Sequence, residues 1–183
     1  HEAVGRAAVD VGRAAELLTQ VKASLGLVPN MTKVMANSPT LLTAYLALSG
    51  AVGGGVLPAG TRERLAISTA QLNGCEYCLS AHTYIGANIA KVDAGELEAA
   101  RTGHSHDPHT AALLRLSNEI AENNGDVSRA GLQSARAHGV TDEEIGEVVA
   151  NIALNVLTNY FNLVADVDND WPVVSLSAVA AAS

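Results

Sequence analysis

Two cysteines and one histidine occupy a short stretch of the chain at a spacing that suits thiol chemistry. Cys75, Cys78 and His82 stand at positions i, i+3 and i+7, which fall on one face of an α-helix. The sulfurs are then close enough to form a disulfide across one helical turn, and the imidazole can accept the thiol proton of Cys78. We therefore predict a redox-active dithiol rather than a structural disulfide.

A thiol needs local help to ionise, because its ordinary pKa of about 8.5 leaves little thiolate at neutral pH. The N-terminus of the expected helix stabilises a thiolate at Cys75, whereas the neighbouring imidazole of His82 favours one at Cys78. These two arguments leave open which sulfur attacks first.

Glu63 is expected to complete a proton relay. It precedes the tight turn at Asn73-Gly74 by about as many residues as His82 follows it, so an antiparallel helical hairpin would place the two side chains at similar depth. The carboxylate would then orient the imidazole and raise its basicity. The expected path runs from Glu63 through His82 and Cys78 to Cys75.

The remainder of the chain is predicted to be helical. Apolar residues recur with a helical period, and no stretch alternates like a strand. Start signals include Ser38-Pro39, Asp107-Pro108 and the capping box of Thr141 and Glu144. The expected helices span residues 10–25, 39–50, 59–72, 75–90, 93–101, 108–122, 128–138 and 142–167.

The fold class predicted from this pattern is an all-α bundle of about seven or eight helices. A length of 183 residues suits one domain over residues 1–183, with the redox motif at 63–82 and a small-residue tail from residue 173. The net charge is −8 and the basic residues are dispersed, so we expect no nucleic-acid partner. No apolar run reaches membrane-spanning length and no signal-peptide pattern is present, which favours a cytoplasmic protein with no membrane partner.

Two further interpretations of the polar motifs compete with redox chemistry. Cys75, Cys78, His82 and Glu63 could hold zinc, although closed zinc sites usually draw on a second Cys or His pair. The histidine-rich segment 104–109 lacks the strands of a metallohydrolase and is interpreted as a polar interhelical loop. We therefore expect no metal and no cofactor, and inert helix cysteines remain a weaker alternative.

The last expected helix is unusually poor in charge. Few charged residues lie between Val148 and Val164, so one side of the helix could face a partner subunit. Asn159, Tyr160 and Asn162 interrupt this apolar stretch. A polar role near the site is one interpretation of them, and interhelical hydrogen bonding is the role favoured.

The stretch from Glu63 to His82 resembles the alkylhydroperoxidase D and carboxymuconolactone decarboxylase-like superfamily. Its redox members carry a Glu, a Cys-x-x-Cys and a His four residues after the second Cys, at this spacing. The segments Pro29-Asn30-Met31, Ser38-Pro39 and 159–162 extend the resemblance over most of the chain.

This resemblance implies an all-helical fold assembled as a homo-oligomer, commonly a trimer or hexamer. It implies a hydroperoxide substrate, reduced through a disulfide cycle in which Cys78 is peroxidatic and Cys75 resolves the intermediate. Glu63 and His82 take the role of proton relay. The electron donor would be a dithiol or a lipoyl-type group, and thiol-disulfide exchange or a non-catalytic binding role on the same scaffold stays an alternative.

One position departs from the best-known alkylhydroperoxidase, which has a second His immediately before its second Cys. Tyr77 stands there in this chain, which makes the sequence more similar to the peroxidase-related branch. Decarboxylase members lack the dithiol, so the Cys75–Cys78 pair argues against lactone decarboxylation.

Overall fold

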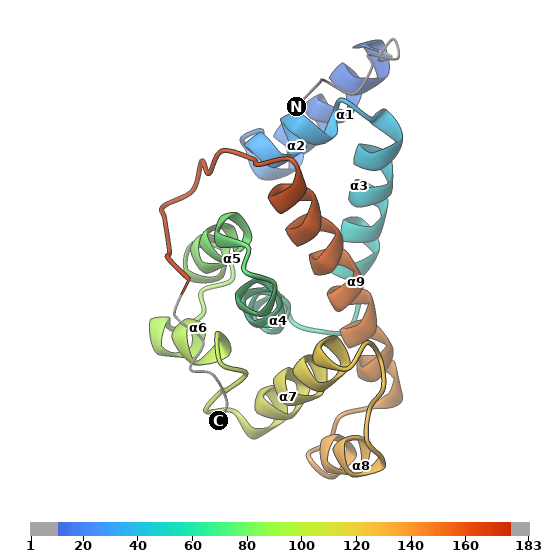
Figure 1. Cartoon of the computed structure of the whole chain (residues 1–183), viewed down its shortest axis with the longest axis vertical. Coiled ribbons are helices and arrows are strands. Elements are labelled where there is room, and N and C mark those ends of the chain that lie inside the picture. Colours follow the sequence, from blue (N-terminus) through green and yellow to red (C-terminus); the bar gives the residue numbers. More distant parts are fainter. Residues whose placement is uncertain (1–10, 177–183) are drawn as a thin grey trace.

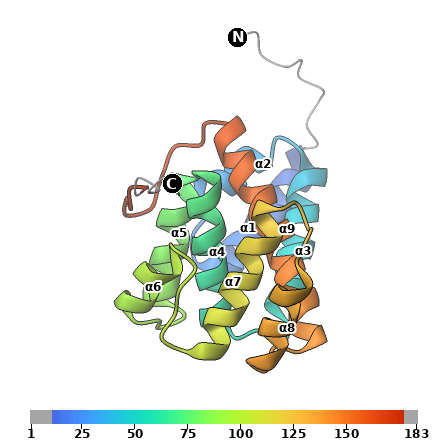
Figure 2. The same cartoon turned by 60° about the horizontal axis from the view of Figure 1, so that its bottom comes forward.

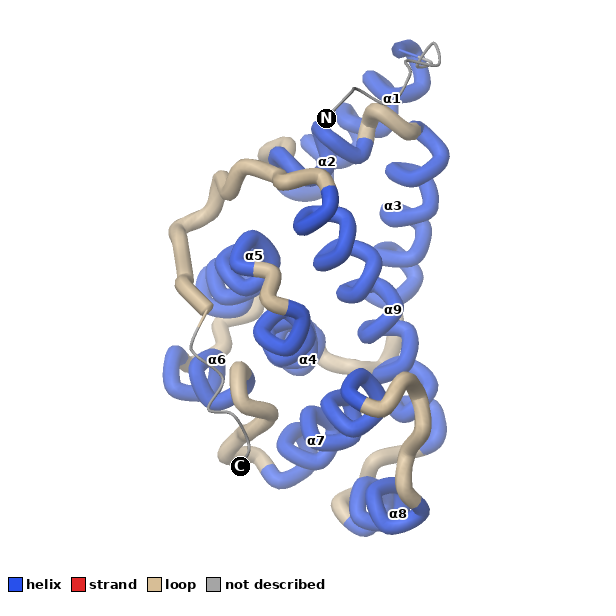
Figure 3. The backbone as a smooth tube through the Cα atoms, viewed as in Figure 1, coloured by secondary structure: helices blue, strands red, loops and turns tan. Residues whose placement is uncertain are grey.

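The computed structural model describes residues 11–176, and Figure 1 shows that this part of the chain is a bundle of helices. In chain order the helices are α1 (Val11–Leu25), α2 (Asn30–Met35), α3 (Pro39–Gly53), α4 (Ala59–Asn73), α5 (Glu76–Asn88), α6 (Ala94–Ala100), α7 (Pro108–Glu122), α8 (Arg129–Ala137) and α9 (Asp142–Val164). Turns and loops join them, with no strand in the described residues (Figure 3). The all-α prediction is confirmed, and the short α2 is the helix that the sequence analysis did not specify.

Side-chain caps begin several helices where the sequence predicts them. Asp107 accepts a hydrogen bond from the backbone N–H of Thr110 and precedes the proline that starts α7. Thr141 and Glu144 form a reciprocal capping box at the start of α9. These caps satisfy backbone donors that have no partner inside the helix.

Helix α4 lies at the centre of the bundle, where α5, α6, α7 and α9 surround it (Figures 1 and 2). Its residues 65–71 are all buried, which is unusual for a surface helix and typical of a central one. Gly74 ends α4 in the left-handed conformation, with φ 69°, so α5 can turn back antiparallel at once. This hairpin carries the whole redox motif.

Helix α9 buries a polar face and exposes an apolar one. Its buried side chains include Asn151, Asn155, Asn159 and Asn162. Its large exposed side chains are Val149, Tyr160, Leu163 and Val164. The polar face is turned toward α4 and α5, so it is available to the site rather than to solvent.

The chain after α9 forms a non-helical C-terminal strap, residues 165–176, that crosses beside α5 (Figure 1). The helix ends at Val164, three residues before the predicted end, and Asp166 has a positive φ of 47°. The side chain of Asn169 and the backbone N–H of Val174 both donate to Ser80 Oγ on α5, at 3.1 and 3.0 Å. The first part of the predicted tail thus packs on its own domain, and residues 177–183 lie outside the described residues.

None of the described helices combines the length and the apolar character that crossing a bilayer requires.

Candidate active site

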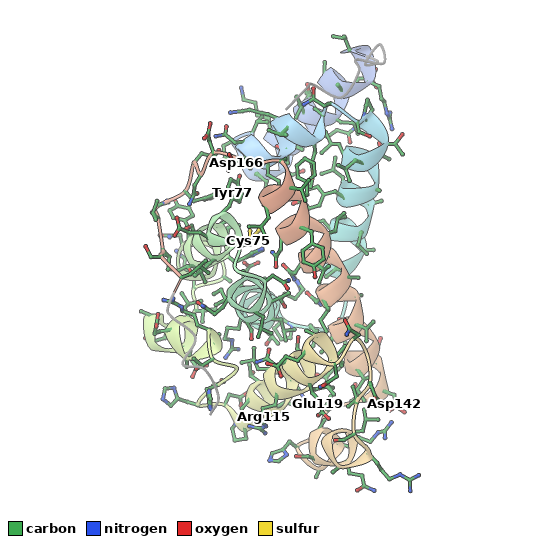
Figure 4. All side chains as sticks on the ribbon, viewed as in Figure 1. Cys75, Tyr77, Arg115, Glu119, Asp142 and Asp166 are labelled. Atoms are coloured by element: carbon green, nitrogen blue, oxygen red, sulfur yellow. The ribbon has the colours of Figure 1, made fainter. Side chains whose placement is uncertain are left out.

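The two cysteines lie at the start of α5, at the turn of the central hairpin. Cys75 is the N-cap rather than the first helical residue, and its Sγ accepts the backbone N–H of Cys78 at 3.3 Å. Both are free thiols, and their exposed fractions are only 1% and 2%. Cys75 and Tyr77, labelled in Figure 4, lie where α5 approaches α2 and α9.

Glu63 on α4 and His82 on α5 lie together, as the hairpin predicted. Glu63 Oε2 and His82 Nδ1 are 2.7 Å apart, and because a carboxylate can only accept, Nδ1 carries the proton. Burial lowers the pKa of His82, but the adjacent carboxylate outweighs it and the net shift is upward. His82 is therefore a proton donor over a wider pH range than a free imidazole.

A cavity of about 220 Å³ opens beside these residues. Cys78, Glu63 and His82 are on its wall, whereas Cys75 is not among the lining residues. Its larger apolar and aromatic lining residues are Leu25, Met31, Tyr45, Val52, Tyr77, Ile85, Leu154 and Trp171. A small molecule in this cavity therefore meets Cys78 before it meets Cys75.

The two thiols share a proton unequally. A hydrogen bond from the Cys78 thiol lowers the pKa of Cys75, burial opposes that effect, and the Cys78 backbone N–H adds to it. The same hydrogen bond raises the pKa of Cys78, and burial and the charge of Cys75 raise it further. The pKa of Cys75 is thus lowered and that of Cys78 is raised. Acidity therefore favours Cys75 as the nucleophile, whereas access to the cavity favours Cys78.

The predicted contact between His82 and the thiol of Cys78 is not formed. Within the described residues, no hydrogen bond joins His82 to either sulfur, because the bond to Glu63 holds the ring toward α4. The two side chains instead face the same cavity. A proton can pass between them through a molecule that occupies the cavity.

Asn162 reaches the dithiol from α9. Its Nδ2 lies 3.1 Å from Cys78 Sγ and 3.4 Å from Met31 Sδ. The sequence favoured interhelical hydrogen bonding for this polar group. Asn159 does form such a bond, with Asn73 at 2.9 Å, whereas Tyr160 is exposed. Asn162 has the alternative role, a polar one near the site, and its contact with a sulfur was not specified from the sequence.

Tyr77 has a structural partner rather than a role in proton relay. Its hydroxyl donates to Asp170 Oδ1 at 2.9 Å and accepts the backbone N–H of Met31 at 3.2 Å. Burial raises the pKa of the Tyr77 hydroxyl, and the Asp170 charge raises it too. The side chain therefore stays neutral and links α5 to α2 and the C-terminal strap.

Residues 104–107 of the histidine-rich segment lie in a polar loop, as interpreted from the sequence, whereas His109 lies in the first turn of α7. His106 Nδ1 contacts Glu96 at 2.7 Å and His109 Nε2 contacts Glu144 at 3.3 Å. Across residues 11–176, no group of three or more His, Cys, Asp or Glu side chains converges as metal ligands do.

Comparison with known proteins gives one family match and several solved structures of similar fold. Residues 39–104 match the carboxymuconolactone decarboxylase family, and no curated protein matches the chain. The structure is similar to an alkylhydroperoxidase D core, peroxidase-related protein of Ralstonia eutropha JMP134, with 22% identity, a TM-score of 0.76 and 94% of each chain covered.

Two further structures have the same fold over most of their length. A peroxidase-related protein of Silicibacter sp. TM1040 is 18% identical, with a TM-score of 0.74 and coverage of 94% of this chain and 91% of the other. The debrominase Bmp8, solved with 2,3,4-tribromopyrrole, is 18% identical, with a TM-score of 0.73 and coverage of 90% and 89%.

Proposed function

We propose that this chain, which matches the carboxymuconolactone decarboxylase family over residues 39–104 and has the fold of an alkylhydroperoxidase D core protein, belongs to that superfamily and is a thiol-dependent peroxidase. It reduces organic hydroperoxides through a Cys75–Cys78 disulfide cycle. One observation carries the proposal: Cys78, Glu63 and His82 face a single cavity, with Cys75 directly behind Cys78.

The first step oxidises Cys78. Its thiol proton moves to Cys75 along their hydrogen bond, which leaves a thiolate at the cavity wall. That thiolate attacks the terminal peroxide oxygen, so an S–O bond forms and the O–O bond breaks. The departing alkoxide takes a proton from His82, which Glu63 holds in its charged form. The products are an alcohol and a sulfenic acid on Cys78.

The second step forms the disulfide. Cys75 attacks the sulfur of Cys78, the S–O bond breaks, and the hydroxide takes the Cys75 proton and leaves as water. The two thiols have then supplied the two electrons that reduce the peroxide. A dithiol or lipoyl-type donor restores the pair by thiol-disulfide exchange, which a reducing cytoplasmic setting favours.

Stopped-flow oxidation with cumene hydroperoxide tests this assignment. Wild type should lose two thiols and gain an internal 75–78 disulfide, identified by mass spectrometry of peptides. Cys78→Ser should abolish the reaction. Cys75→Ser should stop at a sulfenic acid that dimedone traps, because the resolving thiol is gone.

The same experiment separates the alternatives. Full turnover in Cys78→Ser would refute the attack assignment. Reaction with a small disulfide but with no hydroperoxide would identify a thiol-disulfide exchange protein. Thiols of ordinary, slow reactivity toward iodoacetamide would indicate a non-catalytic binding protein.

A second candidate function is removal of a halogen from a small aromatic ring. The aromatic lining by Tyr45, Tyr77 and Trp171 favours it, and the debrominase of similar fold provides the chemical model. Two thiols and one carbon–bromine bond would give a carbon–hydrogen bond, a disulfide, bromide and a proton. Bromide release from a bromopyrrole, without peroxide, would support this function over peroxide reduction.

We also propose that the chain forms a homo-oligomer through α9. Residues 148–165 contain no charged side chain, and the exposed face includes Val164, which is 88% exposed. A second copy of the chain would remove this apolar surface from water. Sedimentation should show an oligomer that Val164→Glu dissociates and that Val11→Glu, at a site on α1 that is 74% exposed, leaves intact.

A further inference from the structure

Cys78 Sγ, the sulfur that faces the cavity, differs from Cys75 Sγ in the kind of hydrogen-bond donor that reaches it. Cys75 Sγ receives the backbone N–H of Cys78 at 3.3 Å because it occupies the N-cap of α5. Cys78 is the third residue of α5, and among the described residues no backbone N–H donates to its sulfur. A side-chain donor reaches its sulfur from outside the hairpin: Asn162 Nδ2 on α9, at 3.1 Å.

The carboxamide of Asn162 is held in a defined orientation. Its nitrogen lies between two sulfurs, those of Cys78 and Met31, so each N–H can point to one of them. The side chain is only 4% exposed, and its Oδ1 has no hydrogen-bond partner among the described residues. An amide oxygen buried in this way costs about 1–3 kcal/mol, a cost that an apolar residue would avoid.

We propose, on the basis of the proposed function, that Asn162 is a catalytic residue that directs thiolate character to Cys78 by donating an N–H to its sulfur. The donor compensates for the missing backbone N–H at the one thiol that the cavity exposes. A hydrogen bond to the charged form favours that form. The proton shared by the two cysteines is thereby biased toward Cys75 at the moment of attack. The buried Asn162 Oδ1 without a hydrogen-bond partner is the cost of placing the amide beside the sulfur.

The direction of the pKa effects agrees with this geometry. The Asn162 hydrogen bond lowers the pKa of Cys78, as does one from Asn159, against the larger upward effects of Cys75 and burial. Asn162 also lowers the pKa of Cys75, but its Nδ2 makes its hydrogen bond to the sulfur of Cys78. The titratable groups that surround Cys78 are Cys75, Tyr77 and His82 on α5, Glu63 on α4 and Tyr45 on α3. None of these is on α9, so Asn162→Ala leaves this set of ionisable groups intact.

The experiment measures the acidity of Cys78 alone, in a Cys75→Ser background, from thiolate absorbance and iodoacetamide rates as a function of pH. Asn162→Ala should raise the pKa of Cys78 by about one unit, which is about tenfold less thiolate at neutral pH. Asn162→Asp keeps the shape but puts a carboxylate at the sulfur, and it should raise that pKa further. Alkylation rates of all variants should converge at high pH, where every thiol is ionised.

A matched control is Asn155→Ala. This substitution removes the same kind of amide from the same face of α9. Asn155 donates to the Asn151 carbonyl and makes no hydrogen bond to a sulfur. The pKa of Cys78 should stay at its value in the Cys75→Ser parent. An unchanged pKa in both Asn162 variants, or an equal rise in Asn155→Ala, would overturn the proposal. This readout needs no peroxide, so it remains decisive even if the peroxidase assignment fails.

Discussion

Tyr77, which stands between the two cysteines in the sequence, donates a hydrogen bond from its hydroxyl to Asp170 Oδ1 at 2.9 Å. This bond joins the redox helix to a strap more than ninety residues later in the chain. The other carboxylate oxygen of Asp170 accepts the backbone N–H of Asn30 at 2.9 Å. One side chain thus fastens α2, α5 and the strap at the rim of the cavity, to which Trp171 contributes.

Tyr77→Phe is expected to destabilise the fold by about 1–3 kcal/mol, because the buried Met31 N–H and the Asp170 carboxylate each lose a partner. Urea unfolding measures this loss. Asp170→Asn should cost less, since an amide oxygen can still accept from Tyr77. If the two hydroxyl contacts contribute nothing, Tyr77→Phe will unfold at the urea concentration of wild type.

Much of the fold could be predicted because its signals are local. Pro39, the Asp107-Pro108 pair and the Thr141 capping box act on backbone groups within one turn, so sequence alone locates the helix starts. The Glu63–His82 pair was also predictable, because a tight turn at Gly74 fixes the register of the two helices that flank it.

The rest of the site depends on contacts that no local pattern encodes. Asn162 is 84 residues from Cys78. Which residue it contacts depends on the orientation of α9 about its own axis relative to the α4–α5 hairpin. Cys75 and Cys78 share one helical face, so periodicity cannot tell which sulfur meets the cavity. The strap has no apolar period, and its path is set by single hydrogen bonds such as those to Ser80.

The Glu63–His82 pair should make stability depend on pH in a defined direction. The pKa of His82 is raised in the folded state above its unfolded value of about 6.5. The stabilisation is therefore complete below pH 6.5 or so and is lost as the pH rises through the folded pKa. Glu63→Gln should reduce the free energy of unfolding more at pH 6 than at pH 9.

A double-mutant cycle provides the control for this pair. In a His82→Gln background, Glu63→Gln should have the same effect at pH 6 and pH 9. Titration of the imidazole by NMR should also show a lower pKa for His82 in Glu63→Gln. If the difference in free energy of unfolding between wild type and Glu63→Gln grew toward alkaline pH, the assignment would be contradicted.

Glu96 is expected to contribute to acid stability. Burial opposes its ionisation, but hydrogen bonds from Ser105, His106 and Arg64 hold its pKa at about 2. Its contribution is present above the unfolded pKa of about 4.5 and is lost as the pH falls toward 2. Solvent screening limits the expected loss to about 1–2 kcal/mol.

Glu96→Gln tests this by unfolding measurements between pH 7 and pH 2. The variant should be less stable than wild type at pH 7, and the two should converge near pH 2. Glu98→Gln is the control, because that side chain is on the same helix and 71% exposed. Parallel pH curves for wild type and Glu96→Gln would show that this carboxylate contributes nothing.

Gly86 is expected to set the spacing between α5 and its neighbours, one turn after His82. A Cβ at this position would lie 2.7 Å from Leu97 Cδ2 and 3.6 Å from Glu63 Cβ. Gly86→Ala should therefore cost about 1–3 kcal/mol through overpacking, despite the better helix propensity of Ala. Gly146→Ala in α9 meets nothing within 4 Å and should instead stabilise by about 0.4–1 kcal/mol. The denaturation midpoints of the two variants should shift in opposite directions from that of wild type. Stabilisation by both substitutions would mean that a Cβ at residue 86 fits between α5 and α6 without overpacking.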